Sequence, residues 1–422
     1  MEFSMNTRFS FHRYDFAAFA AFAVYALCSL SVPLTIVKMG DDLQFPLTDG
    51  GMGQGGALHL VRCCGMVLAL VLCGSIAARI GKRFTMGLSM LLMGAGIFLC
   101  AFSPVYWVFC PLLLLTGFGE GICEGIATPF VQDLHPDNPE RYVNVAHSFW
   151  SIGILLCVFL AGGLLTLEVH WRFVFAGCGI LGLITAVLFF LREKDGYRYP
   201  ESGERVDTVQ LIRKSILIFK TPRFWTYCFC MFVGAGAEFC LTFWAAAYLE
   251  LTFGASAFVA SLGVGVIAAG MFCGRNGVAL IAKRGNLPLI LIICSLGTAV
   301  LSLFLAFIKP EFLPSVSWMY VALFCLLFLC GIGIAPFWPT LQVYGVNSLP
   351  ELDSTLLFII FSAMGIPGCG FFTWIIGVLG DKFGLQGAFL LIPSTMLIYA
   401  LILFLERYVI KNKRPGCQAE RQ

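Results

Sequence analysis

Three carboxylates stand inside long apolar stretches, where an ionisable side chain costs at least about 2.5–3.5 kcal/mol on insertion scales. Glu120 and Glu124 are one helical turn apart on one face, and Glu238 occupies a later stretch. Two carboxylates this close cannot both ionise cheaply, so one is expected to hold a proton that it can lose and regain. We interpret Glu124, Glu120 and Glu238 as candidates for proton coupling, with a neutral structural acid as the alternative for each.

An arginine, Arg62, also stands within an apolar stretch, with His59 one helical turn before it. Three interpretations stay open. The guanidinium pairs with Glu120 or Glu124 and tunes the proton site, or it grips an anionic group of a ligand in a fork geometry, or it extends to the membrane surface. We retain Arg62 and His59 as candidate substrate ligands. A second arginine, Arg275, is expected to bond helix ends.

Amide, hydroxyl and imidazole groups within the apolar stretches accompany flat aromatic rings. Sugar sites use this combination, because a ring covers the C–H side of the sugar while polar groups bond its hydroxyls. A single aromatic residue can equally face lipid or the core. The candidate substrate ligands of this kind are Asn144, His147, Trp244, Tyr248, Trp338 and Gln342, beside the further aromatic residues Trp150 and Trp374.

The composition identifies the kind of element that must position these side chains. Of the 422 residues, 59% are hydrophobic and 12% are charged, against about 25% charged in soluble domains. A polytopic membrane protein fits, whereas a disordered chain, a disulfide scaffold or an ordinary cytosolic enzyme does not. The net charge of +3 gives no nucleic-acid footprint. Nearly all the 18 cysteines lie in apolar runs, as packing residues do, so we expect no metal and no cofactor.

Twelve segments reach the roughly 20 apolar residues that a membrane-spanning helix needs. Most of the Lys and Arg residues fall on one side of these spans, which predicts that both termini are cytoplasmic. Pro336 and Pro339 predict a bend in span ten, either fixed or moving during gating. The predicted spans are 16–38, 54–77, 85–103, 107–131, 144–167, 171–191, 224–249, 257–282, 287–308, 317–342, 354–380 and 386–406.

A polar, charged stretch at 192–223 divides the spans into two sets of six, and we expect it to be a surface linker. The domains are then an N-terminal lobe at 1–191, the linker, a C-terminal lobe at 224–406 and a cytoplasmic tail at 407–422. Twelve spans in two halves are the layout of many secondary transporters. The sequence therefore predicts an all-α integral membrane fold of two six-helix lobes.

A glycine-rich and basic motif lies between spans two and three. It comprises Gly74, Arg79, Gly81, Lys82 and Arg83. This stretch resembles the loop motif of the major facilitator superfamily, whose form is G-x-x-x-D-R-x-G-R-R. Ala78 stands where the family has Asp, and 282–285 is a fainter copy in the second half. The resemblance implies two lobes that rock about a central site.

A second resemblance runs from span four into span five. Glu124 precedes Thr128-Pro129-Phe130, and Asn144 and His147 open the next span. This is similar to the fucose permease branch, the fucose–galactose–glucose:proton symporters. The acid that the branch carries in its first helix has no counterpart at 29–34, and Thr128 replaces its Asn. The resemblance implies proton-coupled sugar symport.

Two functions follow as expectations. The first is proton-coupled symport of a sugar or sugar-like solute, neutral or anionic, by a monomer in the plasma membrane, which is the inner membrane if the cell is bacterial. The alternative is a proton-driven exporter of amphipathic compounds, which the 14% aromatic content would suit. A sensor or an enzyme is disfavoured, because the sequence has no sizeable soluble domain and no catalytic motif. The expected partners are a small solute, the proton and the lipid bilayer, without nucleic acid.

Overall fold

The computed structural model describes residues 10–191, 198–200, 208–283, 285–309, 311 and 315–410. Its secondary structure within these residues is helical, without strands. The helices are α1 (Arg13–Asp42), α2 (Met52–Ile80), α3 (Lys82–Cys100), α4 (Tyr106–Leu134), α5 (Pro139–Thr166), α6 (Trp171–Phe190), α7 (Thr208–Phe219), α8 (Pro222–Phe253), α9 (Ala257–Ile281), α10 (Leu287–Phe307), α11 (Val316–Ile334), α12 (Pro339–Ser348), α13 (Ser354–Ala388), α14 (Leu391–Phe404) and η2 (Leu405–Ile410).

Twelve helical segments of the described chain are long and apolar enough to cross a membrane, which confirms the predicted fold. In this set α11 and α12 together form one span, and α14 continues into η2. The predicted gap between the last two spans, from 380 to 386, contains Gly384, whose non-helical conformation (φ 74°, ψ 156°) separates two helices within α13. The short second helix ends at Ala388, and α14 begins at Leu391.

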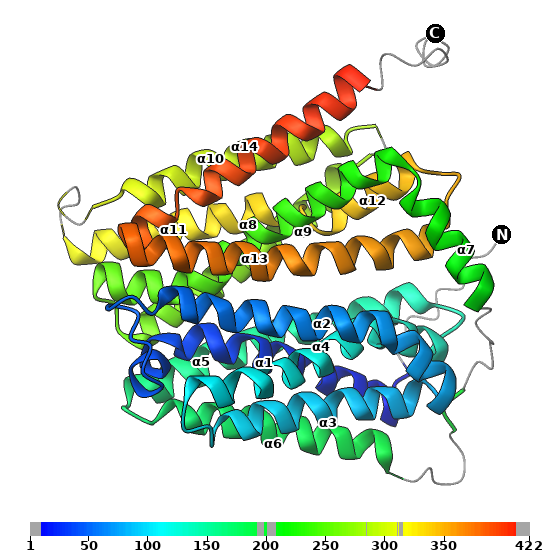
Figure 1. Cartoon of the computed structure of the whole chain (residues 1–422), viewed down its shortest axis with the longest axis horizontal. Helices are drawn as coiled ribbons and strands as arrows, with labels where there is room; N and C mark the ends of the chain where they lie inside the picture. The colour runs from blue at the N-terminus through cyan, green and yellow to red at the C-terminus, as the bar shows by residue number, and fades with distance from the viewer. Residues whose placement is uncertain are drawn as a thin grey trace.

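The spans form two groups that lie side by side with their long axes roughly parallel (Figure 1). Helices α1 to α6 form the N-terminal lobe, and α8 to α14 form the C-terminal lobe. We call the end of the molecule at which α1 begins the Arg13 end, and the opposite end the Asp42 end. The start of α1, η2 and α7 all lie at the Arg13 end in Figure 1.

Glycines let α4 lie against the backbone of α2. A Cβ on Gly117 would lie 2.1 Å from the carbonyl oxygen of Arg62, and one on Gly121 would lie 2.3 Å from that of Met66. No side chain fits there, so the small residues of α4 permit a close approach of the two helices. The contact fixes the position of Arg62 along the helix axis relative to the two glutamates of α4.

Span ten is broken where the two prolines predict a bend. The α-helix α11 ends at Ile334, a turn follows, and α12 begins at Pro339. Pro339 occupies the first turn of α12, where its missing N–H leaves no bond unmade. The break lies between two straight segments of one span.

The stretch 192–223, predicted as a surface linker, contains a helix in its described part. Helix α7 lies across the ends of the spanning helices in Figure 1. Lys214 Nζ lies 2.9 Å from Asp353 Oδ2 at the start of α13, and Ile218 is buried. Charged residues interleaved with the short apolar run concealed this helix from a search for long spans. Residues 192–197, 201–207 and 411–422 lie outside the described chain.

The lobes meet where α2 packs on α13 and α5 packs on α9. A Cβ on Gly370 would lie 2.8 Å from the backbone of α2, and nearer the Asp42 end one on Gly377 would lie 2.2 Å from it. Gly74 lies five helical turns after Gly56, hence on the same face of α2. Gly56 touches the α13 backbone, but Gly74 has nothing within 4 Å of its added Cβ. The lobes are therefore closed together at the Asp42 end and separate toward the Arg13 end.

Candidate functional site

Arg62 lies at the centre of a buried polar cluster in the N-terminal lobe. Its Nη1 donates to the carbonyl oxygen of Ser29 at 2.7 Å, and its Nη2 donates to Ser29 Oγ at 3.2 Å. Its Nε lies 3.4 Å from Glu120 Oε2, without the alignment of a hydrogen bond. Of the three interpretations of Arg62, the structure contains the ion pair with Glu120. Both side chains are buried, so Arg62 does not extend to the membrane surface.

His59 connects this cluster to the other lobe. Arg62 Nη2 lies 3.0 Å from His59 Nδ1, and because arginine only donates, Nδ1 must accept and the ring proton sits on Nε2. The ring of His59 stacks on Phe239 of α8, with centroids 5.1 Å apart and planes at 15°, and lies 5.1 Å from Phe243. His59 is therefore a neutral link between α2 and α8, enclosed on its faces by aromatic rings.

Glu124 occupies a different environment from Glu120, one turn away. Its side chain is exposed, and its Oε2 accepts a hydrogen bond from Tyr25 Oη of α1 at 3.3 Å. The Tyr25 ring packs edge-on against Trp150 of α5, with centroids 4.5 Å apart. Sequence reasoning missed Tyr25, because a tyrosine in a span carries no burial cost that would single it out. One carboxyl is thus enclosed with a cation, and its neighbour is accessible beside a hydroxyl.

His147 and Thr128 form a polar pair between α5 and α4. Thr128 Oγ1 and His147 Nε2 are 3.0 Å apart, and the His147 ring lies 4.5 Å from the Phe22 ring of α1. Arg275 of the other lobe lies close enough to His147 for an electrostatic interaction between the two side chains. These neighbours place the exposed His147, with the exposed Asn144 one turn before it, on the side that faces the other lobe. Thr128, which stands where the fucose permease branch has Asn, supplies the hydroxyl that contacts His147.

The C-terminal lobe contributes Glu238 of α8. Glu238 is buried, Arg275 Nη2 of α9 lies 3.9 Å from its Oε1, and its Oε2 has no hydrogen-bond partner in the described chain. The sequence predicted that Arg275 bonds helix ends. The structure instead places it beside this acid. Each lobe places one arginine beside one buried glutamate near the middle of its helices.

The remaining candidate ligands are used in packing within the C-terminal lobe. Trp244 Nε1 donates to the carbonyl oxygen of Thr373 at 2.9 Å, and Tyr248 Oη donates to that of Leu305 at 2.5 Å. Both side chains are fully buried with their polar atoms satisfied, so we leave them out of the site. Gln342 Nε2 donates to Ser362 Oγ at 2.8 Å. Trp338 is half-buried, with its indole against Gly365.

The glycine-rich and basic motif braces the Arg13 end of the N-terminal lobe. Gly81 has φ 83° and turns the chain from α2 into α3, a conformation that favours glycine. Lys82 Nζ lies 2.7 Å from Asp133 Oδ2, and Arg83 Nη1 donates to Tyr14 Oη at 2.9 Å. Lys82 and Arg83 thus tie the start of α3 to α4 and α1. Gly74 and Arg79 are exposed.

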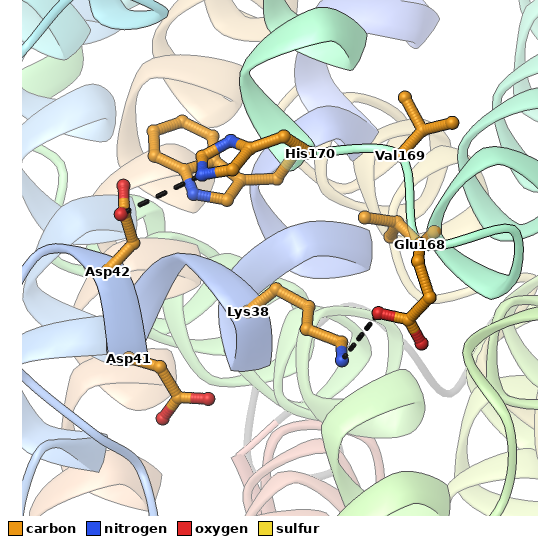
Figure 2. A pocket seen from close by; sticks show the side chains of 8 residues that line it. Lys38, Asp41, Asp42, Glu168, Val169 and His170 are labelled. Carbon is orange, nitrogen blue, oxygen red and sulfur yellow. Dashed lines mark ion pairs between the residues drawn. The ribbon is translucent and has the colours of Figure 1, made fainter.

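A pocket of about 380 Å³ opens at the Asp42 end, and none of its lining residues belongs to the buried cluster. Two pairs of its side chains lie close together (Figure 2): Lys38 Nζ is 4.0 Å from Glu168 Oε2, and His170 Nε2 is 3.7 Å from Asp42 Oδ1. All its lining residues belong to the N-terminal lobe. The described residues contain no group of His, Cys, Asp and Glu side chains able to hold a metal. The candidate site is therefore the set of polar side chains described above between the lobes, which includes Glu124, His147 and Glu238.

Comparisons with known proteins agree with this architecture. The family model of the Major Facilitator Superfamily matches residues 17–369. No curated protein sequence matches the chain.

Solved structures similar to the chain include three transporters. A D-xylose–proton symporter has a TM-score of 0.74 and 15% identity, covering 93% of this chain and 97% of its own. The nucleoside transporter NupG has a TM-score of 0.74 and 13% identity, covering 94% and 98%. A variant of the Escherichia coli fucose:proton symporter FucP has a TM-score of 0.61 and 16% identity, covering 94% and 99%. At these identities the likeness shows the fold, and the family match gives the rest: the chain is a multi-pass membrane transporter of the Major Facilitator Superfamily.

Proposed function

We propose that the protein couples the movement of a neutral, sugar-like solute to that of a proton, in the same direction, by alternating access. The observation that carries this proposal is the pairing of one enclosed carboxyl, Glu120 beside Arg62, with one accessible carboxyl, Glu124, a helical turn away. Both lie near the middle of α4. A membrane-embedded acid that is accessible in one state and must be neutral to be enclosed is suited to carrying a proton.

Charge balance within the N-terminal lobe assigns the two acids different tasks. Arg62 compensates Glu120, so this pair can stay ionised together in a dry environment. Within the described residues, Glu124 accepts a hydrogen bond from the hydroxyl of Tyr25 and has no cation beside it. An ionised Glu124 is tolerated while solvent reaches it and becomes costly when the lobes close around it. Closure therefore favours the protonated form, which links proton movement to the exchange of access.

The substrate class follows from the state of Arg62. Its Nη atoms are bonded to Ser29 and His59, and its Nε faces Glu120. No fork of free donors is left on Arg62 for a carboxylate or sulfonate, and Arg275 lies beside Glu238, whose carboxylate can balance its charge. We therefore infer a neutral solute. The accessible groups beside Glu124 are Asn144 and His147, with the aromatic Trp150 near Tyr25. Hydroxyl-bonding groups beside an aromatic face suit a sugar, as do the xylose, fucose and nucleoside named for the similar structures.

The distribution of Lys and Arg supports a placement in which the Arg13 end and both termini are cytoplasmic. In that placement the structure is open toward the cytoplasm. We infer a monomer in the plasma membrane, in which the lobe containing Glu238 and Arg275 rocks against the lobe containing Glu124. The motif from Glu124 to His147 supports the fucose permease branch as a functional model.

The proposal is tested with the full chain in liposomes under an inward proton gradient. Neutral pentoses, hexoses and nucleosides are offered beside a hexuronate. We expect a neutral sugar or nucleoside to accumulate above equilibrium, and a protonophore to abolish the accumulation. Glu124→Gln should lose accumulation but keep equilibrium exchange, because a permanently neutral side chain still allows closure.

Glu168→Gln is the matched control, since Glu168 is an exposed acid at the Asp42 end and should change neither measurement. Gradient-driven accumulation by Glu124→Gln equal to that of the unmodified chain would contradict the proton role. Preferred accumulation of the hexuronate would contradict the neutral substrate. Expulsion of amphipathic dyes, with no sugar uptake, would favour the exporter instead.

A further inference from the structure

The first turn of α2 receives its hydrogen bonds from the opposite lobe. The residue before α2 is Gly51, which has no side chain to cap the helix, and the first amides of a helix have no partner within it. Met52 N donates to Asp381 Oδ1 and Gly53 N donates to Asp381 Oδ2, both at 2.8 Å. Asp381 belongs to α13, so one carboxylate of the C-terminal lobe caps a helix of the N-terminal lobe.

The same relation holds in reverse on the other side of the interface. Helix α9 begins at Ala257, and its second amide, Phe258 N, donates to Thr166 Oγ1 of α5 at 2.9 Å. Helices α2 and α9 are the second spans of their lobes, and α5 and α13 are the fifth. Each lobe therefore uses a side chain of its fifth span to bond the first turn of the other lobe's second span.

These bonds exist only while the helices touch at the Asp42 end. A Cβ on Gly377 would lie 2.2 Å from the carbonyl oxygen of Met52, and one on Gly56 would lie 2.7 Å from that of Thr373. On the other side, a Cβ on Gly162 would lie 2.8 Å from Ser261. Separation of the lobes here would remove Asp381 from α2 and Thr166 from α9 together.

We propose that Asp381 and Thr166 form a reciprocal helix-capping latch, which stabilises the state closed at the Asp42 end and must release for that end to open. Asp381 is the stronger half, because a carboxylate interacts with both the amide groups and the positive end of the helix dipole, whereas Thr166 supplies one neutral acceptor. At the Arg13 end the motif at 74–83 has Ala78 in the place of the family's acid. The latch thus biases the chain toward the state described.

Hydrogen–deuterium exchange of the full chain in lipid nanodiscs tests the latch without any substrate or proton gradient, so its outcome is independent of the proposed function. Asp381→Asn removes the charge and one of the two acceptors, and should shift the ratio of the two states about two- to fivefold, the usual effect of losing an exposed charge at a helix N-terminus. We expect faster exchange in peptides covering 50–58 and 373–381. Peptides covering the Arg13 ends of α2 and α9 should exchange more slowly, because that end closes as the other opens.

Asp41→Asn is the matched control, since Asp41 is an exposed acid at the same end and its loss removes the same charge. It should leave both ends unchanged. Faster exchange confined to 50–58, without protection at the Arg13 end, would reduce the contact to local helix capping and overturn the latch. Unchanged exchange in Asp381→Asn at both ends would overturn it as well.

A second pair of variants keeps the test decisive if Asp381→Asn fails to fold. Thr166→Ala removes the acceptor from Phe258 N, and Thr166→Ser keeps it. Thr166→Ala should produce the same two-ended change with a smaller shift, of about two- to threefold, and Thr166→Ser should match the unmodified chain. Identical exchange in these two variants would contradict the reciprocal arrangement.

Discussion

The N-terminal and C-terminal lobes each hold an arginine beside a buried glutamate, but the two pairs differ in enclosure. In the Arg62–Glu120 pair the side chains are 3% and 0% exposed and 3.4 Å apart. In the Arg275–Glu238 pair they are 49% and 9% exposed and 3.9 Å apart. Arg62 is further bonded to Ser29 and His59, whereas Arg275 has no hydrogen bond among those described. The first arginine is fixed in place, and the second is free to change partners.

This difference indicates that the two ion pairs respond differently when the lobes move. An enclosed ion pair is costly to break, because each charge would be left without water or a partner. The N-terminal pair is therefore a constant element, beside which Glu124 gains and loses its proton in the proposed mechanism. The C-terminal pair borders the space between the lobes and is weakened by solvent. It is the pair that lobe movement can rearrange.

The sharpest test of this comparison is Arg62→Ala. It leaves Glu120 enclosed without a cation, and we expect the free energy of unfolding to fall by about 3–5 kcal/mol. Reversible unfolding of the purified chain in detergent measures the change. Arg62→Met with Glu120→Gln should recover most of the loss, since neither charge then remains. Equal stability of Arg62→Ala and the unmodified chain would show that Glu120 is already neutral.

The hydrogen bond from Tyr25 to Glu124 should have an intermediate effect. Tyr25→Phe removes a donor without changing the ring that packs on Trp150, and we expect sugar affinity or coupled uptake to fall about two- to tenfold, which corresponds to about 0.5–1.5 kcal/mol. Tyr399→Phe is the control, because the Tyr399 hydroxyl is buried without a partner in the described chain. Equal losses in both variants would indicate a general packing effect.

Arg275→Ala should have the smallest effect on stability. The Arg275 guanidinium is half exposed and 3.9 Å from the Glu238 carboxylate, so we expect a change in the free energy of unfolding below about 1 kcal/mol. The same unfolding measurement, run beside Arg62→Ala, gives the contrast between the lobes. A loss as large as that of Arg62→Ala would mean that the two pairs are equivalent.

The spanning helices were predictable from sequence because long apolar runs have few alternatives in a membrane. Helix α7 was missed because its apolar run is short and lies among charges. The boundary between the last two spans was predictable, because Gly384 interrupts the apolar run where the backbone turns.

The buried acids of the site were predictable because burial of charge is costly enough to need a reason. Pairing of Arg62 with Glu120 was one of three alternatives, and only the close contact of α2 with α4 decides among them. The direction in which a side chain points within its lobe was not predictable. Trp244 and Tyr248 therefore looked like ligands but are packed, whereas Tyr25 was overlooked.

The backbone contact at Gly117 and Gly121 has a mechanical consequence. Two helices separated by less than the width of a methyl group cannot slide past each other or swing apart without a void opening in the protein. Helices α2 and α4 must therefore travel as one rigid piece through the whole transport cycle. The guanidinium of Arg62 therefore keeps its register with Glu120 at every stage of the lobe movement.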